Sequence, residues 1–273
     1  MTHAESPSRR PTLFAAGISA RQAGEVLILY EEESRHVRAL RLAPGSSIRL
    51  TDGAGTLWDA RLTSGSGRTA ECVLDARSVP APALPVELAF GVGNKAHVMW
   101  LVEKATEMGV RRLVPVESER TRSVADAGRS PAFWNKARRR AVSAMKQSGG
   151  AWLPEFEPPR PLDDYTARQT GSGDRIPDAP ELLVRLDGTG GGLRGVLAPW
   201  AGVPPVGILV GPEGGWSAGE IALLDDAGLV PASLGPLVLR FETAAIASLA
   251  IVAQHILARD AAGDRPHSRQ AGG

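Results

Sequence analysis

The spacing of hydrophobic and polar positions changes along the chain and divides it into two parts. Between residues 12 and 78, short apolar runs are separated by glycine-rich turns, which is typical of a small β-barrel. We expect strands at 26–29, 47–50, 56–60 and 69–74. One helical period interrupts them over Glu33–Leu42 and would direct Val37 and Leu40 inward.

After the proline-rich segment 80–85, apolar runs alternate with helical periods. This alternation predicts a mainly parallel sheet with helices on both sides, an α/β domain. We therefore expect an N-terminal barrel domain over 1–80, an α/β domain over 81–260 and a disordered tail over 261–273. The expected strands are 86–92, 112–116, 182–186, 206–210 and 230–234, and the expected helices are 97–108, 131–148, 163–168, 218–224 and 243–258. The segment 170–180 is expected to be a mobile insertion.

One stretch combines a buried strand, a glycine loop and a helix start. The apolar run Val206–Val210 is followed by Gly211-Pro212-Glu213-Gly214-Gly215. Ser217 and Glu220 then have the spacing of a capping box, which predicts a helix. Ligands bind at such strand-to-helix junctions in open α/β sheets. An ordinary tight turn is the alternative interpretation.

A second stretch, Leu234–Ala244, again runs from a short strand through a Gly-Pro loop into a helix. It places Arg240 and Glu242 in an apolar setting, where charges are costly unless they are satisfied. This favours a functional role for both. Glu242 could act as a base, or it could be a carboxylate that the free N–H groups of a helix start satisfy. A structural pair of Arg240 with Glu242 is the alternative.

Composition and charge narrow the class of protein. The 273 residues are 43% apolar and 22% charged, as in globular proteins, and the net charge is only +1. However, basic residues are concentrated between Arg120 and Lys146, where Asp126 is the one acidic residue. Such a stretch suits contact with a phosphate backbone, although a solvated helix face gives the same pattern. Arg35, Arg38 and Arg41 form a second row, on the barrel.

Several classes of site and location are not expected. Cys72 is the single cysteine, which excludes an internal disulfide and a thiolate zinc site, and the five histidines have no ligand spacing. We therefore predict no metal. The N-terminus has no apolar signal core and no apolar run approaches the ~20 residues of a membrane span. We expect a cytoplasmic protein without a membrane partner.

The segment Gly190–Gly195 matches the dinucleotide-binding pattern G-x-G-x-x-G. The match has little weight, because five of the eight residues from Gly188 to Gly195 are glycine and Pro199 breaks the helix that should follow. We do not predict a dinucleotide site.

Taken together, the two C-terminal stretches resemble a known family. Gly211–Glu220 followed by Leu234–Ala244 is similar to the paired signature of the RsmE-type 16S ribosomal RNA uridine-N3 methyltransferases, which are SPOUT-class enzymes. The segments 36–45, 103–110 and 141–149 agree in order. The resemblance implies a PUA-like RNA-binding barrel and a trefoil-knotted SPOUT methyltransferase domain. It also implies S-adenosylmethionine as cofactor, a homodimer formed through the knot, and methylation of N3 of one uridine of 16S ribosomal RNA within the small subunit.

The resemblance also implies site residues. The cofactor-binding residues would be Leu209, Gly211, Glu213, Gly214, Leu234, Gly235, Leu239 and Glu242. The catalytic candidates are Arg240, which would stabilise the uracil oxyanion, and Glu242. The RNA-binding candidates are Arg35, Arg38, Arg41, Arg120, Arg122, Arg139, Arg140 and Lys146. The chain departs from the family at 150–152, where an arginine is usual, and at Phe241, where a small polar residue is usual. There are two alternative functions. The protein could methylate another target, such as a ribose 2′-hydroxyl, or it could be a non-catalytic RNA-binding assembly factor.

Overall fold

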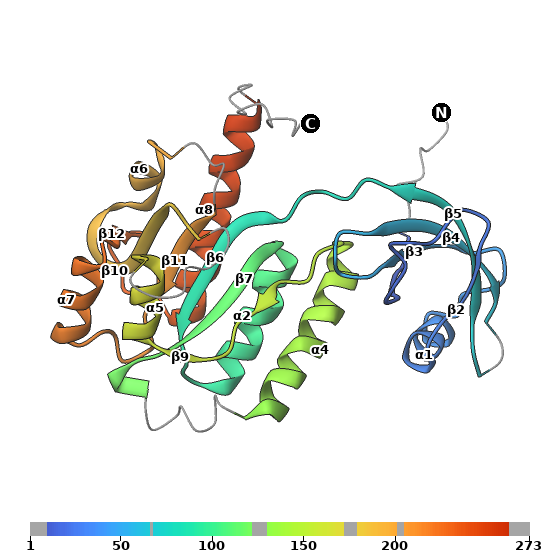
Figure 1. Ribbon diagram of the computed structural model, residues 1–273, viewed down its shortest axis with the longest axis horizontal. Helices are drawn as coiled ribbons and strands as arrows, with labels where there is room; N and C mark the ends of the chain where they lie inside the picture. The colour runs from blue at the N-terminus through green and yellow to red at the C-terminus, as the bar shows by residue number, and fades with distance from the viewer. Residues whose placement is uncertain (1–9, 66–67, 122–129, 172–178, 201–204, 262–273) are drawn as a thin grey trace. The chain divides into compact units, whose positions relative to one another are not determined.

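The computed structural model describes residues 10–65, 68–121, 130–171, 179–200 and 205–261, with side chains described up to residue 259 (Figure 1). The chain forms two compact units. The first comprises Met1–Pro82 together with Ala141–Leu153, and the second comprises Ala83–Arg140 together with Pro154–Gly273. Arg122, much of the segment 170–180 and the tail after 261 lie outside the described residues, so the predictions made for them stay predictions.

The first unit is built around one five-stranded sheet in the order β1-β3-β4-β5-β2. Its strands are β1 (Thr12–Phe14), β2 (Val26–Ile28), β3 (Ser47–Thr51), β4 (Leu57–Ser64) and β5 (Glu71–Ser78), and its N-terminal helix is α1 (Glu31–Ala39). β1 pairs with β3 in parallel, and the other pairs are antiparallel. Among the described residues no pairing joins β1 to β2, so closure of the predicted barrel stays a prediction.

The alternating pattern of the first unit accounts for its core. Ile48, Leu50 and Leu62 point to one buried face, and Trp58 donates a hydrogen bond from Nε1 to the Ile18 carbonyl at 3.1 Å. Val37 of α1 is fully buried, as its helical spacing predicts. The same prediction is wrong for Leu40, which is 44% exposed because α1 ends at Ala39 and the chain leaves the helical path.

The second unit contains a parallel sheet in the order β12-β10-β11-β6-β7-β8, with β9 also paired to β7. Its strands are β6 (Leu84–Gly91), β7 (Val110–Glu117), β8 (Glu155–Phe156), β9 (Arg160–Pro161), β10 (Leu182–Gly192), β11 (Val206–Val210) and β12 (Val230–Ser233). Its helices are α2 (Lys95–Glu107), the 3-10 turn η1 (Glu119–Thr121), α5 (Leu162–Gln169), α6 (Leu193–Leu197), α7 (Ala218–Asp226) and α8 (Phe241–Ala261). The helix α4 (Pro131–Ser148) contributes residues to both units. The predicted α/β class is confirmed.

Helices cover both faces of this sheet (Figure 1). Ala89 of β6 and Leu209 of β11 belong to a core cluster with residues of α5 and α7. The neighbouring Phe90 points the other way and its ring lies 6.2 Å from that of Phe241 at the start of α8. This contact explains why an aromatic residue occupies position 241. α2 and α8 pack against each other on that second face.

The glycine-rich run that matches the dinucleotide pattern is part of strand β10. Gly191 and Gly192 pair with Ala232 and Ser233 of β12. A Cβ atom on Gly190 would lie 1.8 Å from the Pro231 carbonyl oxygen, so the close approach of the two strands requires glycine there.

Helix α8 is unusually apolar. By length and composition alone, Phe241–Arg259 could cross a membrane, a test that the core helices of water-soluble proteins also meet. In this structure α8 packs on α2, α6, β6 and β11. Only part of its apolar surface is covered by these contacts, since Leu257 remains 58% exposed.

Candidate functional site

A cleft of about 490 Å³ lies at the carboxyl ends of three neighbouring parallel strands. β11, β6 and β7 are adjacent in the sheet, so the loops that follow them meet at one edge. The residues lining the cleft come from these three loops and are Gly93, Asn94, Lys95, Arg120, Thr121, Pro212, Glu213 and Gly214. The glycine loop singled out in the sequence is therefore part of a cavity.

The shape of the glycine loop depends on close packing around it. A Cβ atom on Gly211 would lie 2.9 Å from Nε1 of the buried Trp216. One on Gly91, at the end of β6, would lie 2.7 Å from Pro212. Gly215 has a φ of +67°, a conformation that side chains other than glycine rarely adopt. The loop thus brings its backbone closer to β6 than side chains at these positions would allow.

The predicted capping box fixes the end of this loop. Ser217 accepts a hydrogen bond from the Glu220 backbone N–H, and Glu220 accepts one from the Ser217 N–H at 2.8 Å. The other oxygen of the Glu220 carboxylate accepts from the Glu119 N–H, also at 2.8 Å. Glu220 is 5% exposed. One buried carboxylate therefore holds the glycine loop and the η1 loop together.

Arg120 forms a second contact between the η1 loop and the glycine loop. Its Nη1 donates a hydrogen bond to the Gly214 carbonyl oxygen. The structure thus places this residue, which the sequence assigned to RNA contact, in the cleft lining itself.

Three ionisable side chains meet beside the cleft. His97, in the first turn of α2, has its Nδ1 2.5 Å from Oε1 of Glu213 and 3.8 Å from Oε2 of Glu242. The Glu242 Oε2 atom is buried and has no hydrogen-bond partner. Asn94 caps α2 by accepting the Ala96 N–H at 2.8 Å, which orients this turn. The group links the glycine loop to the start of α8.

The second glycine-containing loop is arranged differently. Leu234 is half-buried, whereas Gly235, Leu239 and Arg240 are exposed, and none of the four is among the residues lining the cleft. Ser233 Oγ bridges this turn by contacting the backbone N–H and carbonyl of Gly235. Among the described residues, no ion pair joins Arg240 to Glu242. Leu209 is fully buried in the core. Of the predicted cofactor residues, Glu213 and Gly214 thus line the cleft, Gly211 begins the loop to which they belong, and Glu242 is linked to Glu213 through His97.

The predicted RNA-binding residues differ in how accessible their charges are. Lys146 is mostly buried, with Nζ 2.5 Å from Glu33 Oε1, and Arg140 pairs with Glu103. Arg139 is exposed on α4. On the first unit, Arg35 pairs with Glu31 at 3.5 Å and Arg38 donates to the Arg68 carbonyl at 3.4 Å, while Arg41, with φ +53°, lies beyond the end of α1.

Sequence reasoning missed the contribution of the β6–α2 junction. Gly93, Asn94, Lys95 and His97 were not among the candidates, although they follow a buried strand and begin a helix. The signal that would have found them is the same strand-to-helix rule that found the glycine loop, applied to a junction without a recognisable motif.

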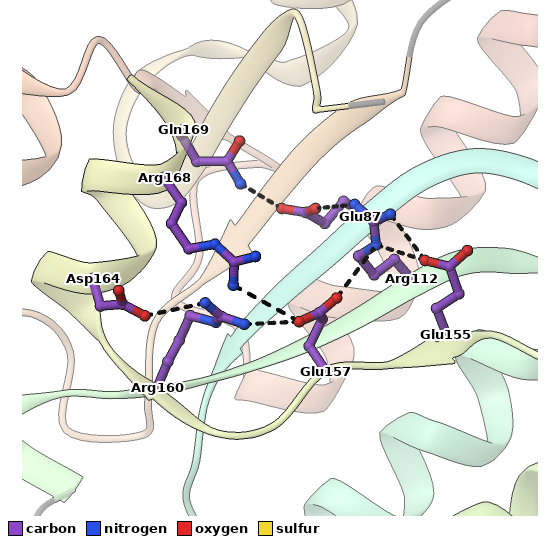
Figure 2. Close-up of polar contacts among 8 residues, drawn as sticks. All are labelled: Glu87, Arg112, Glu155, Glu157, Arg160, Asp164, Arg168 and Gln169. Atoms are coloured by element: carbon purple, nitrogen blue, oxygen red, sulfur yellow. Dashed lines mark hydrogen bonds and ion pairs between the residues drawn. The ribbon is translucent and has the colours of Figure 1, made fainter. Parts of the chain in front are cut away.

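A separate network of charged side chains lies in the same unit (Figure 2). Glu87 is 1% exposed and accepts hydrogen bonds from Tyr165 at 3.1 Å, Gln169 at 2.8 Å and Arg112 at 3.2 Å. Arg112 is also bonded to Glu155 at 2.9 Å. Burial raises the pKa of the Glu87 carboxyl, and the contacts with Arg112, Tyr165 and Gln169 offset part of that effect.

Around this pair the network extends to β9 and α5. Arg160 bonds Glu157 at 2.7 Å and Asp164 at 3.1 Å, and Arg168 lies 3.9 Å from Glu157.

Among the described residues, no group of three or more His, Cys, Asp or Glu side chains is arranged to hold a metal ion. Elsewhere, burial raises the pKa of the Cys72 thiol to about 11, so this cysteine is not a reactive thiolate.

Comparison with known proteins identifies both parts of the chain. Residues 80–253 match the model of an RNA methyltransferase domain, and residues 29–75 match that of an RNA methyltransferase PUA domain. A relative from Synechocystis sp., named "Ribosomal RNA small subunit methyltransferase E", is 29% identical over 219 residues, which cover 78% of this chain and 67% of the relative.

Two solved structures are also similar. That of a ribosomal RNA small subunit methyltransferase E from Neisseria gonorrhoeae, bound to S-adenosyl methionine, has a TM-score of 0.74 at 24% identity and covers 90% of this chain and 98% of its own. That of a probable rRNA-methyltransferase from Porphyromonas gingivalis has a TM-score of 0.69 at 26% identity and covers 93% and 99%.

Proposed function

Since this chain belongs to the family of RNA methyltransferase domains and carries the PUA domain of RNA methyltransferases, we propose that it methylates N3 of one uridine in 16S ribosomal RNA. The methyl donor would be S-adenosylmethionine and the substrate would be the small ribosomal subunit. The resemblance to RNA methyltransferases recognised in the sequence motifs is confirmed by both matches. The name of the Synechocystis relative supports the choice of ribosomal RNA.

The observation that carries the proposal is the cleft at the carboxyl ends of β11, β6 and β7. It is lined by Pro212, Glu213 and Gly214. Two buried polar atoms in the surrounding structure have no hydrogen-bond partner: Glu242 Oε2, 3.8 Å from His97, and Trp216 Nε1, beside Gly211. An acceptor and a donor without hydrogen bonds suit a polar ligand, because a buried group that lacks a hydrogen bond is otherwise costly. The neighbouring structure that is bound to S-adenosyl methionine supports the same ligand.

When bound, S-adenosylmethionine would supply an activated methyl group, so the reaction needs neither a metal nor a covalent nucleophile. The residues of the chain would orient donor and acceptor and stabilise negative charge on the uracil oxygens. Gly211, Glu213 and Gly214 would hold the cofactor, with Leu209, Leu234, Gly235, Leu239 and Glu242 completing its site. Arg240, which is exposed beside the start of α8, would stabilise the uracil oxyanion.

RNA contact would come from both units. Arg35, Arg38 and Arg41 lie on the PUA-containing unit, and Arg139 is exposed on α4. Arg120, Arg122, Arg140 and Lys146 complete the proposed set. For Lys146 and Arg140, contact with phosphate requires exchange of the ion pairs with Glu33 and Glu103.

We further propose a homodimer formed through a knotted C-terminal domain. Its support is apolar surface left uncovered on α8 and on the loop before it, where Leu237 and Val238 are 78% and 102% exposed. The domain boundary at residue 80 is supported by the two family matches, which meet between 75 and 80. A cytoplasmic location follows from the proposed substrate.

Mass spectrometry of nucleosides from treated RNA tests the function. Small subunits isolated from a strain that lacks this protein are incubated with the purified protein and S-adenosylmethionine, in parallel with naked 16S RNA. We expect 3-methyluridine from the subunits. A ribose-methylated nucleoside would indicate another target, and no methylation together with no cofactor binding in calorimetry would leave the assembly-factor hypothesis.

The cofactor site is tested by Gly214→Val. A Cβ atom at this position would already contact Arg120 at 3.4 Å, so the added methyl groups of valine would crowd the cleft. We expect S-adenosylmethionine binding to fall by at least about tenfold in calorimetry, which corresponds to ~1.4 kcal/mol. Gly195→Val is the matched control, because nothing lies within 4 Å of its Cβ position. Normal binding by Gly214→Val would remove the glycine loop from the cofactor site.

A further inference from the structure

Methylation of uridine at N3 requires a proton acceptor, and the proposed function leaves that acceptor unassigned. N3 of neutral uracil carries a proton, which must leave as the new N–C bond forms. The need for this acceptor rests on the proposed function. The candidates beside the cleft are the three ionisable groups that meet there, His97, Glu213 and Glu242.

The two carboxylates are poorly arranged to receive this proton themselves. The Glu242 side chain is only 16% exposed, and its Oε2 faces the His97 ring. Glu213 is 47% exposed, but its Oε1 is engaged by His97 Nδ1 at 2.5 Å. Both carboxylates are therefore directed at the imidazole.

His97 has the complementary arrangement. A carboxylate only accepts hydrogen bonds, so Nδ1 carries the hydrogen in the contact with Glu213, and a neutral ring then has its lone pair on Nε2. Among the described residues none forms a hydrogen bond with Nε2, and the side chain is 37% exposed. Asn94 and Lys95, in the same first turn of α2, line the cleft.

We propose that His97 is the catalytic base of this enzyme, with Nε2 accepting the N3 proton of uracil and with Glu213 and Glu242 as positioning residues. In the transfer, N3 forms a bond to the methyl carbon, and the bond between that carbon and the sulfonium sulfur breaks with both electrons remaining on sulfur. The N3 proton goes to Nε2. The imidazolium that results is stabilised by the two carboxylates at its other nitrogen, as in other carboxylate–histidine pairs.

The other charged groups around the cleft do not compete for this role. Lys95 and Arg120 line it as cations, and Arg120 is bonded to the Gly214 carbonyl. Cations near the acceptor would favour the developing negative charge on the uracil oxygens. His97 is thus the one imidazole among the ionisable groups that line or adjoin the described cleft.

The test is the pH dependence of single-turnover methyl transfer by wild type and by His97→Gln. For the wild type, we expect the rate to rise with pH and then level off as His97 becomes neutral. For His97→Gln, we expect a rate at least about 100-fold lower that keeps rising with pH, since solvent must take the proton. The affinity for S-adenosylmethionine, measured by calorimetry, should change by less than about threefold.

His255→Gln is the matched control, because His255 lies on α8 against Trp200, where Nε2 is 3.2 Å from its carbonyl oxygen. This variant should keep the wild-type profile. A His97→Gln variant with the wild-type rate and profile would overturn the proposal, and so would a rate that falls only in proportion to cofactor affinity.

A measurement on the wild-type protein keeps the test independent of how the variants fold. The ring-proton NMR signal of His97, assigned by its absence in His97→Gln or His97→Asn, should titrate over the same pH range as the transfer rate. Titration in a different range would contradict the proposal. If the wild type formed no 3-methyluridine, the proposed function itself would fail, which distinguishes that failure from the failure of His97 as base.

Discussion

Two clusters of carboxylates and basic side chains in the second unit differ in how completely their buried carboxylate is hydrogen-bonded. At the centre of the network in Figure 2, both oxygens of Glu87 are bonded and Arg112 contacts three carboxylates, although Arg160 Nε and Gln169 Oε1 of the same network are buried without a hydrogen-bond partner. In the His97–Glu213–Glu242 group, one oxygen of Glu242 is buried without a hydrogen-bond partner, with His97 Nδ1 at 3.8 Å, and His97 is partly exposed. We infer that the hydrogen bonding of the buried carboxylate, more than charge or burial, separates the structural pair Glu87–Arg112 from the functional group of His97, Glu213 and Glu242.

The physical reason lies in what each cluster is left to do. A buried charge whose hydrogen-bonding positions are all occupied cannot bind another ligand. Removal of one partner leaves the charge buried and unpaired, which strongly destabilises the folded state. A cluster beside a cleft that lacks a partner can exchange solvent for a ligand or a proton. Substitution in the first cluster should therefore lower stability, whereas substitution in the second should lower activity.

The largest effect should follow from Arg112→Met. Arg112 is 6% exposed and is the cation that faces the buried Glu87 carboxylate, so its removal leaves that charge unpaired. We expect a loss of about 3–5 kcal/mol in the free energy of unfolding, measured by urea denaturation. The double variant Glu87→Met with Arg112→Met should recover part of that loss. A loss below about 1 kcal/mol would show that the network is not structural.

Glu242→Gln should give the opposite result. Glutamine keeps the shape but removes the charge that faces His97 at 3.8 Å. We expect the free energy of unfolding to change by less than about 1 kcal/mol and the rate of methyl transfer to fall about tenfold, with a changed pH profile. Glu155→Gln is the control from the other cluster, since Glu155 is 56% exposed and should leave transfer unchanged. An unchanged rate in Glu242→Gln would contradict the comparison.

A smaller effect is expected for Ser217→Ala. The hydroxyl accepts the Glu220 N–H at 3.1 Å and forms half of the capping box that ends the glycine loop. Its loss should cost about 1 kcal/mol of unfolding free energy, measured by thermal denaturation. Ser217→Asp should retain most of the stability, because an aspartate also caps a helix. Equal losses in both variants would indicate that the cap does not stabilise the loop.

Sequence patterns predicted most of the elements in the second unit. The strand Val206–Val210 and the capping box of α7 are confirmed, because a five-residue apolar run and an S-x-x-E spacing are local signals. Leu40 was assigned to the wrong side, because the end of α1 was placed too late. The boundaries of helices depend on contacts that a local pattern does not contain.

The candidate site was predictable only in part. The glycine loop carries its own motif, whereas His97 gains its role from Glu213 and Glu242, which are more than 100 residues away in the chain. Pairing of this kind follows from strand order, since β6 lies beside β11 in the sheet although β7, β8, β9 and β10 intervene in sequence. The same holds for Arg112 and Glu87, whose partners Glu155 and Gln169 come from later segments.

The smallest predicted effect is the pH dependence that Glu87 contributes to stability. Burial raises the pKa of Glu87 above its ordinary value of 4.5, so over the interval between 4.5 and the raised value the folded state binds more protons than the unfolded state. Stability must then fall as pH rises through that interval and be constant above it. Glu87→Gln removes this titration.

The contribution is isolated by a difference between two proteins. Other carboxyls act in the opposite direction: the pKa of Asp187 is lowered, because hydrogen bonds from Thr189 and Arg185 outweigh the effect of burial, and its contribution is lost as pH falls. Such terms are common to wild type and Glu87→Gln and cancel in the difference of their unfolding free energies. That difference, from urea denaturation at a series of pH values, should change only above 4.5 and then become flat. A difference that does not vary with pH would mean that Glu87 has the same pKa in the folded and unfolded states. The hydrogen bonds from its partners would then offset the effect of burial on that pKa completely.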